Sequence, residues 1–124
     1  MSKILIIEDD PDTARVVAKR LEQEGLSVIV ALDAYEGTKM AHSQKPDLII
    51  LDLMLPAGGG LFVLGNIRMS AETRSLPIIV LTGVKAEDTK EKAQKLGVEA
   101  YLEKPYEPAV LVSTVKNILE GKVS

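Results

Sequence analysis

Acidic side chains follow two short apolar segments of this chain. Glu8 and Asp9 come directly after the apolar run 4–7, and Asp52 comes directly after the run 48–51. Runs of four apolar residues are too short for helices and are typical of strands buried on both faces of a parallel sheet. Ligands of such sheets bind outside the carboxyl ends of the strands, where these carboxylates would lie. Asp is also a common turn residue, so Asp52 alone is equally compatible with a turn.

The apolar pattern predicts the elements that would position these groups. We expect strands at residues 3–7, 28–30, 48–51, 77–81 and 100–102. We expect helices at residues 11–24, 34–44, about 61–67, 86–96 and 108–119, with Asp10 and Asp33 as N-caps and Gly25 as a helix end. This alternation predicts an α/β fold: a doubly wound, flavodoxin-like, five-stranded parallel sheet of order 2-1-3-4-5 with five helices on both faces.

Two segments of the predicted fold are expected to be mobile. Residues 57–60 read Ala-Gly-Gly-Gly, which predicts a flexible loop because glycine restricts the backbone least. The helix at 86–96 carries many charged side chains and few large apolar ones beyond Leu96. We therefore expect this helix to be only loosely anchored to the core.

The composition limits the classes of function. The 124 residues suit one domain, 1–124, and the longest apolar runs are strand-sized, so we expect a soluble, cytoplasmic protein without a membrane span. The chain has no cysteine, and its single histidine, His42, lies in a polar context, which disfavours zinc sites and a Ser-His-Asp triad. The net charge of -3 predicts no basic surface for nucleic acid, and three Tyr and one Phe provide little aromatic surface for stacking with bases.

The predicted strand order gathers the polar groups at one place. Strands one and three would end side by side, which brings Glu8 and Asp9 next to Asp52. Three neighbouring carboxylates repel one another unless a cation lies among them, and an all-oxygen ligand set suits Mg²⁺. Thr82 and Lys104 follow the fourth and fifth strands on the same edge. A metal, a hydroxyl and an ammonium around one carboxylate could hold a phosphoryl group, with Asp52 as the nucleophile.

The sequence resembles the receiver domains of two-component response regulators, over essentially its whole length. The acidic pair that gathers the metal in this family falls on Glu8 and Asp9, and the phosphoacceptor falls on Asp52. The family's further metal ligand, a backbone carbonyl two residues beyond the acceptor, falls on Met54. The resemblance therefore implies Mg²⁺ as the cofactor. Asp10, next to the acidic pair, is expected to serve as a helix cap instead.

The same resemblance implies a switch. The family's switch hydroxyl falls on Thr82, its switch aromatic on Tyr101, and its phosphate-pairing lysine on Lys104, followed by the typical Pro105. The phosphoryl donor would be a sensor histidine kinase or a histidine phosphotransfer protein. The output surface would be the fourth helix, fifth strand and fifth helix, which could bind a downstream effector or output domain or form a dimer. Such a chain is a phosphoacceptor and not an enzyme, although it assists its own phosphorylation.

The side chains of Met54 and Val84, which flank the expected acceptor, are both apolar. Neither can orient an attacking water molecule, so we expect slow self-dephosphorylation.

Three other readings remain open. A pseudo-receiver would only bind protein, although such domains tend to lose the acids or the lysine. A small aspartyl-phosphate phosphatase of the haloacid-dehalogenase type would need a second Asp where this chain has Met54. A flavodoxin-like cofactor binder would need Ser, Thr and Gly in its first loop, where Glu8, Asp9 and Asp10 would repel a phosphate.

Overall fold

A five-stranded parallel sheet forms the centre of the molecule. The computed structural model describes residues 2–83 and 87–121. The sheet has the order β2-β1-β3-β4-β5, and every neighbouring pair is parallel. Its strands are β1 (Lys3–Ile7), β2 (Ser27–Ala31), β3 (Leu48–Asp52), β4 (Ile78–Thr82) and β5 (Ala100–Glu103). The predicted fold class and strand order are confirmed.

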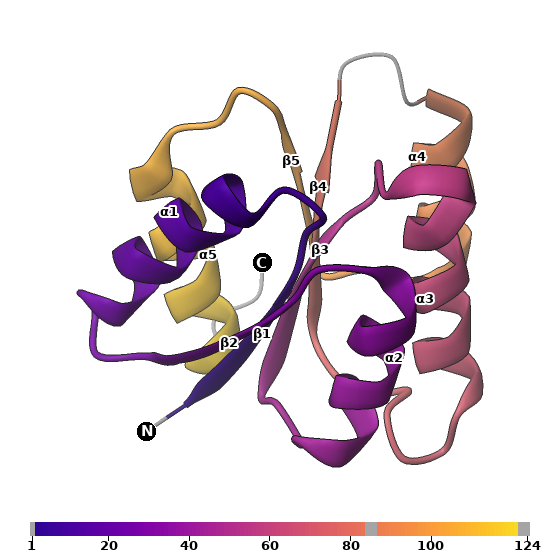
Figure 1. Ribbon diagram of the computed structural model, residues 1–124, viewed down its shortest axis with the longest axis horizontal. Coiled ribbons are helices and arrows are strands. Elements are labelled where there is room, and N and C mark those ends of the chain that lie inside the picture. Colours follow the sequence, from indigo (N-terminus) through magenta and orange to yellow (C-terminus); the bar gives the residue numbers. More distant parts are fainter. Residues whose placement is uncertain (1, 84–86, 122–124) are drawn as a thin grey trace.

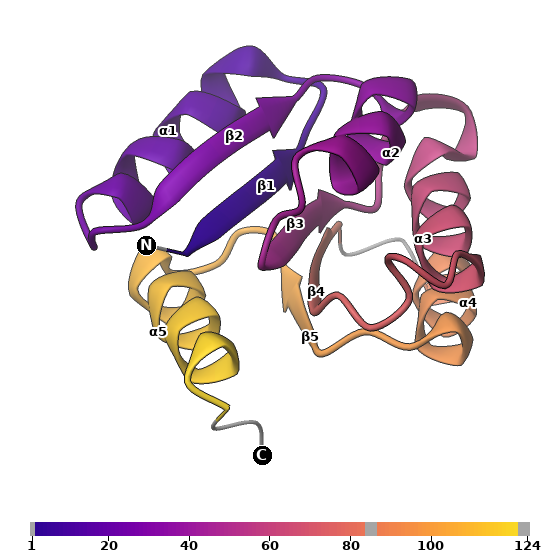
Figure 2. The same cartoon turned by 90° about the horizontal axis from the view of Figure 1, so that it is seen from below.

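Helices cover both faces of this sheet. Figure 1 shows α1 (Pro11–Glu22) and α5 (Pro108–Leu119) together on one side of it. The opposite side carries α2 (Ala34–Ser43), α3 (Gly59–Met69) and α4 (Glu87–Leu96), and Figure 2 shows the same division from below. A 3-10 turn, η1 (Pro56–Gly58), precedes α3. Because all strands run the same way, their carboxyl ends share one edge, at the top of Figure 1.

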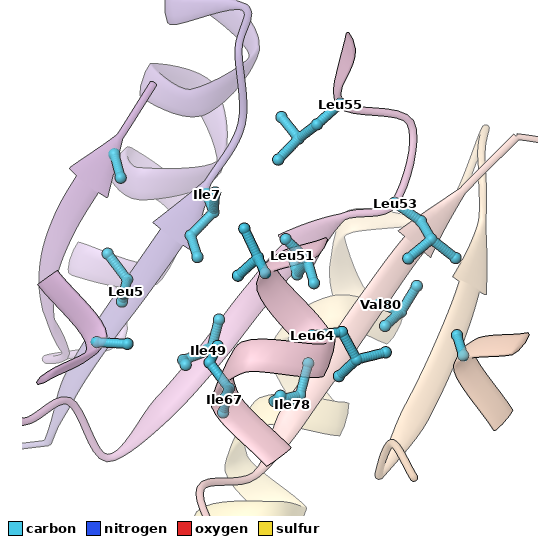
Figure 3. Packing of buried hydrophobic residues seen from close by; sticks show 14 residues of the cluster. Leu5, Ile7, Ile49, Leu51, Leu53, Leu55, Leu64, Ile67, Ile78 and Val80 are labelled. Carbon is cyan, nitrogen blue, oxygen red and sulfur yellow. The ribbon is translucent and has the colours of Figure 1, made fainter. Parts of the chain in front are cut away.

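The core consists of two apolar layers, one on each face of the sheet. Successive side chains of a strand point to opposite faces, so β1, β3 and β4 contribute to both layers. The layer under α2, α3 and α4 is shown in Figure 3 and includes Leu5, Ile7, Ile49, Leu51 and Leu64. The layer under α1 and α5 includes Ile4, Ile6, Leu21, Ile50 and Leu111. This burial on both faces explains the unbroken apolar runs in the sequence.

Local capping residues set the predicted helix ends. The Asp10 side chain caps α1, accepting hydrogen bonds from the Asp12 N–H and the Thr13 hydroxyl. The Asp33 side chain caps α2 by accepting from the Glu36 N–H at 2.8 Å. Helix α1 ends at Glu22, slightly before the expected position, and Gly25 reverses the chain with φ +85°. Both caps agree with the sequence-based prediction.

The loop predicted at residues 57–60 is wrong for Gly59 and Gly60, which belong to α3, whereas Ala57 and Gly58 lie in the turn before it. Ala57 and Gly58 have left-handed backbones within the η1 turn, and α3 then begins at Gly59. Gly59 and Gly60 are both buried in this first helical turn. Glycine's intrinsic freedom argues for a loop, but close packing of these two residues against neighbouring elements stabilises the helix instead.

The expectation for α4 agrees with its packing. Ala93 is the buried residue of the described helix, and most of its charged side chains face the solvent. The expected first residue of this helix, residue 86, lies outside the described residues, as does Val84. Within residues 2–83 and 87–121, no helix has the length and apolar character needed to cross a lipid bilayer.

Candidate functional site

The ends of β1 and β3 bring three carboxylates together. Glu8 and Asp9 directly follow β1, and Asp52 is the last residue of β3, the strand that pairs with β1. Oxygen atoms of these three side chains lie within 4.8 Å of one another. Glu8 and Asp52 are each only 4% exposed, whereas Asp9 is open to solvent. The acids that the sequence singled out therefore form one cluster at the carboxyl edge of the sheet.

Lys104 reaches this cluster from the end of β5. Its backbone N–H donates to the Thr82 carbonyl at 2.8 Å, which continues the pairing of β4 and β5 by one residue. Its Nζ donates to Asp52 Oδ2 at 3.1 Å and lies 3.5 Å from Glu8 Oε1. Burial alone would lower the pKa of Lys104, but the charges of Asp52 and Glu8 raise it above its usual value. The lysine is therefore held in its charged form.

One lysine does not neutralise the buried acids. The pKa of Glu8 is raised to about 7, chiefly by burial. The hydrogen bond from the Asp10 N–H to the Glu8 carboxylate lowers this pKa, and the negative charge of Asp52 raises it. The Oε1 atom of Glu8 is buried and accepts no hydrogen bond within the described part of the chain. The hydrogen-bonding capacity of this atom therefore remains unused, although the Lys104 ammonium at 3.5 Å offsets part of its charge.

The Asp52 carboxylate is held from two directions. Its Oδ1 accepts a hydrogen bond from the Met54 N–H at 2.9 Å, while its Oδ2 faces Lys104. The intervening Leu53 N–H donates to the Leu81 carbonyl at 2.8 Å, which ties this turn to the end of β4. Sequence reasoning could not identify the Met54 N–H as a donor to Asp52, because a backbone donor does not depend on residue type.

The donor set suits a hard divalent cation. The three side chains that could bind the ion all offer carboxylate oxygens, and these include Glu8 Oε1, which accepts no hydrogen bond within the described residues. Hard cations such as Mg²⁺ prefer oxygen ligands and complete their shell with water, which the exposed position of Asp9 allows. The fit therefore agrees with the sequence-based expectation for Glu8, Asp9 and Asp52.

Thr82 and Tyr101 occupy different positions relative to the acids. Thr82 ends β4 and is 1% exposed, and within the described residues its hydroxyl makes one long hydrogen bond, 3.4 Å, to the Gly83 carbonyl. Tyr101 is partly buried against the core layer under α4, and its hydroxyl donates to the Lys90 carbonyl at 2.9 Å. Burial raises the pKa of this phenol. The Tyr101 ring therefore links β5 to α4 and does not touch the acidic cluster.

A family model described as the response regulator receiver domain matches residues 4–116. The chain belongs to this receiver-domain family.

The receiver domain is similar to several characterised proteins. It is 32% identical to the phosphate regulon transcriptional regulatory protein PhoB of Klebsiella pneumoniae, covering 94% of this chain and 51% of PhoB. It is 30% identical to protein PilH of Pseudomonas aeruginosa, covering 98% of this chain and 100% of PilH. The structure of the chemotaxis response regulator CheY4 of Vibrio cholerae matches with a TM-score of 0.86 at 27% identity, covering 95% of this chain and 98% of that one.

The receiver domain spans about half the length of PhoB and of several other curated relatives that it matches. Its membership in the family rests on nearly the whole chain, because the matches to PilH and to CheY4 cover almost every residue of both partners. The acidic cluster of Glu8, Asp9 and Asp52 lies within the matched residues.

Proposed function

We propose that this receiver domain accepts a phosphoryl group on Asp52 in a Mg²⁺-dependent reaction and thereby changes its output surface. The observation that carries the proposal is the contact of Asp52 with Lys104, 3.1 Å between Oδ2 and Nζ, within an acidic cluster in which Glu8 Oε1 accepts no hydrogen bond among the described residues. A buried carboxylate held next to a charged ammonium combines a nucleophile with a group that pairs with phosphoryl oxygens.

Each residue of the site then has a defined task. The Met54 N–H and the Lys104 ammonium fix the two oxygens of Asp52, so the carboxylate is positioned for in-line attack on phosphorus. Glu8 and Asp9, with Asp52 and the Met54 carbonyl, would hold Mg²⁺, which neutralises charge on the phosphoryl oxygens when bound. The new bond joins an Asp52 oxygen to phosphorus, and the bond from phosphorus to the donor's histidine nitrogen breaks.

The response to phosphorylation begins at Thr82. Among the described residues its hydroxyl makes one long hydrogen bond, and breaking this bond so that the hydroxyl turns to a phosphoryl oxygen costs little free energy. The Tyr101 side chain would then leave Lys90 and rotate inward, which alters the surface formed by α4, β5 and α5. The weak anchoring of α4 makes such a change feasible.

The proposal includes the remaining sequence-based expectations. Residues 1–124 would form one phosphoacceptor signalling domain that is not itself an enzyme. The donor would be a sensor histidine kinase or a histidine phosphotransfer protein. The α4-β5-α5 surface would bind a downstream effector or output domain, or a second copy of the chain. The cytoplasmic location remains a prediction, as does the absence of nucleic-acid binding by this domain.

The decisive experiment uses a small phosphodonor. We expect incubation with acetyl phosphate and Mg²⁺ to add one phosphoryl group per chain, detected by intact mass, and we expect Asp52→Asn to abolish the addition. Asp33→Asn is the matched control, because asparagine caps a helix as well as aspartate and Asp33 lies in the α2 cap. Removal of divalent ions with EDTA should prevent the reaction in all variants.

The outcome also separates the alternatives. A pseudo-receiver would gain no phosphoryl group at all. A phosphatase would release phosphate continuously from many phosphoesters without a lasting mass change. A phosphoryl group that persists in Asp52→Asn would contradict the proposed acceptor.

A further inference from the structure

The first turn of α3 lies against the backbone that follows the phosphoacceptor. A Cβ atom built on Gly60 would lie 2.5 Å from the Leu53 carbonyl oxygen, 2.7 Å from its Cα and 2.8 Å from its carbonyl carbon. The atoms in the way are backbone, so no side-chain rotation can relieve the contact. Gly60 is not among the residues with a left-handed backbone. The glycine is therefore required by space and not by its own conformation.

The Leu53 carbonyl is rigidly linked to a donor of the site. It belongs to the same planar peptide unit as the Met54 N–H, and rotation of one turns the other. That N–H donates to Asp52 Oδ1 at 2.9 Å. The Leu53 N–H is held on the other side by the Leu81 carbonyl at 2.8 Å, and the Leu53 side chain is buried in the core near Val80 (Figure 3). The peptide between Leu53 and Met54 thus lies between α3, which approaches its carbonyl, and Asp52, which accepts a hydrogen bond from its N–H.

We infer that Gly60 is a positioning residue for Asp52: by allowing α3 to approach Leu53, it sets the orientation of the peptide that fixes the Asp52 carboxylate. The expected effect of Gly60 on phosphorylation rests on the proposed function of Asp52 as the phosphoacceptor. Its geometric part, the coupling of Gly60 to the Met54 N–H, is testable without any phosphoryl transfer.

The same helix contains the controls. A Cβ on Gly65 would meet nothing within 4 Å, so Gly65→Ala changes the glycine content of α3 without a clash. A Cβ on Gly59 would meet side-chain carbons, Ala34 Cβ at 3.1 Å and Leu55 Cβ at 3.3 Å, and no backbone atom of the acceptor turn. Gly59→Ala therefore reports on crowding of α3 that does not act on the Leu53 carbonyl.

The test compares the three variants with the unmodified chain in two measurements. In Mg²⁺-free nitrogen–proton correlation spectra, we expect the Met54 amide signal to move upfield in Gly60→Ala, because its hydrogen bond to Asp52 lengthens, and to stay in place in Gly65→Ala. The initial rate of phosphorylation by acetyl phosphate should fall about tenfold or more in Gly60→Ala. Gly65→Ala should keep the rate of the unmodified chain.

The outcomes are distinguishable. A folded Gly60→Ala with an unchanged Met54 signal and an unchanged rate overturns the inference, as does an equal effect of Gly59→Ala. If Gly60→Ala does not fold in buffer, the spectra are recorded in trimethylamine N-oxide, which favours folded states. Failure to fold there would also overturn the inference, because Gly60 would then be needed for the fold and not for the acceptor. If the unmodified chain and Gly65→Ala take up no phosphoryl group, the proposed function fails, while the Met54 signal still decides the role of Gly60.

Discussion

The Glu8 carboxylate lies in an environment that disfavours its charge. It is buried beside Asp52, and Lys104 is its ion-pair partner among the described residues, at 3.5 Å. Burial, opposed by the Asp10 N–H and assisted by the Asp52 charge, raises its pKa from 4.5 to about 7. Protonation therefore favours the folded state over the unfolded chain. Below about pH 4.5 Glu8 is neutral in both states, and above about pH 8 it is charged in both.

In metal-free buffer, we thus expect the free energy of unfolding to fall as the pH rises from about 5 to 8. Glu8→Gln should remove most of this decline and be more stable than the unmodified chain at pH 8, by about 1–3 kcal/mol, with little difference at low pH. Urea unfolding with EDTA at both pH values measures this. Glu22→Gln, an exposed change on α1, is the control. If the free energy of unfolding of the unmodified chain and of Glu8→Gln depended on pH in the same way, the charged Glu8 carboxylate would not destabilise the fold as we expect.

Met54 determines a second property at the scale of single residues. Its side chain is 52% exposed next to the acceptor and offers no polar atom that could orient water. We therefore expect a long-lived phosphoryl group, and Met54→Asn should shorten its lifetime by up to about tenfold, because an amide can position an attacking water molecule. Loss of the added mass after removal of acetyl phosphate gives the lifetime. Met69→Asn, at an 84% exposed position at the end of α3, should leave it unchanged.

At the scale of elements, Arg68 joins α3 to the segments on either side of α4. Its Nε donates to the Gly97 carbonyl at 2.9 Å, just beyond the end of α4, and its Nη1 donates to the Arg74 and Leu76 carbonyls. Its Nη2 donates to Glu99 Oε1, which also accepts from the Ile78 N–H. The carboxyl end of α4 is thereby fixed. The middle of α4 is held to β5 through Lys90, whose carbonyl accepts from the Tyr101 hydroxyl and whose ammonium lies 5.4 Å from the centre of the Tyr101 ring and 3.6 Å from Glu103 Oε1.

Arg68→Met should keep the apolar stem but leave these carbonyls without their donor. We expect a loss of about 1–3 kcal/mol in the free energy of unfolding, since four hydrogen bonds, one of them part-buried, are lost together. Amide hydrogen exchange should increase most in α4 and at the start of β4. Arg74→Met, an exposed arginine in the same connection, serves as the control. Equal stability of the two variants would show that the Arg68 contacts are marginal.

The elements also show which structural information is local in sequence. Strand order and the caps at Asp10 and Asp33 could be predicted, because alternation and cap chemistry depend on nearby residues. The helical start at Gly59 and Gly60 could not, because it depends on contacts with α2 and with the acceptor turn. The hydrogen bonds of Arg68 to the Gly97, Arg74 and Leu76 carbonyls and of Tyr101 to the Lys90 carbonyl have no sequence signal either, since a carbonyl is present in every residue type.

At the scale of the whole molecule, the parallel sheet brings residues from distant parts of the sequence together in one site. Each strand ends on the same edge, so side chains that follow β1, β3 and β5 meet around Asp52 although they are distant in the chain. This convergence could be predicted because the strand order follows from the alternation of elements. The distances within the site could not, because they depend on backbone positions such as that of Met54.

The convergence of three carboxylates and one lysine on this edge predicts how the whole fold responds to Mg²⁺. A cation that binds the folded cluster and not the unfolded chain stabilises the fold by mass action, by about 1.4 kcal/mol at ten times its dissociation constant. We expect MgCl₂ to raise the unfolding temperature by about 4–7 °C relative to NaCl of the same ionic strength. Asp9→Asn should reduce this shift, because it replaces a charged carboxylate ligand at the solvent side of the cluster by a neutral amide. Asp88→Asn, an exposed change on α4, should keep it. Equal shifts in these two variants would mean that the ion acts on the general surface charge and not at the acceptor site.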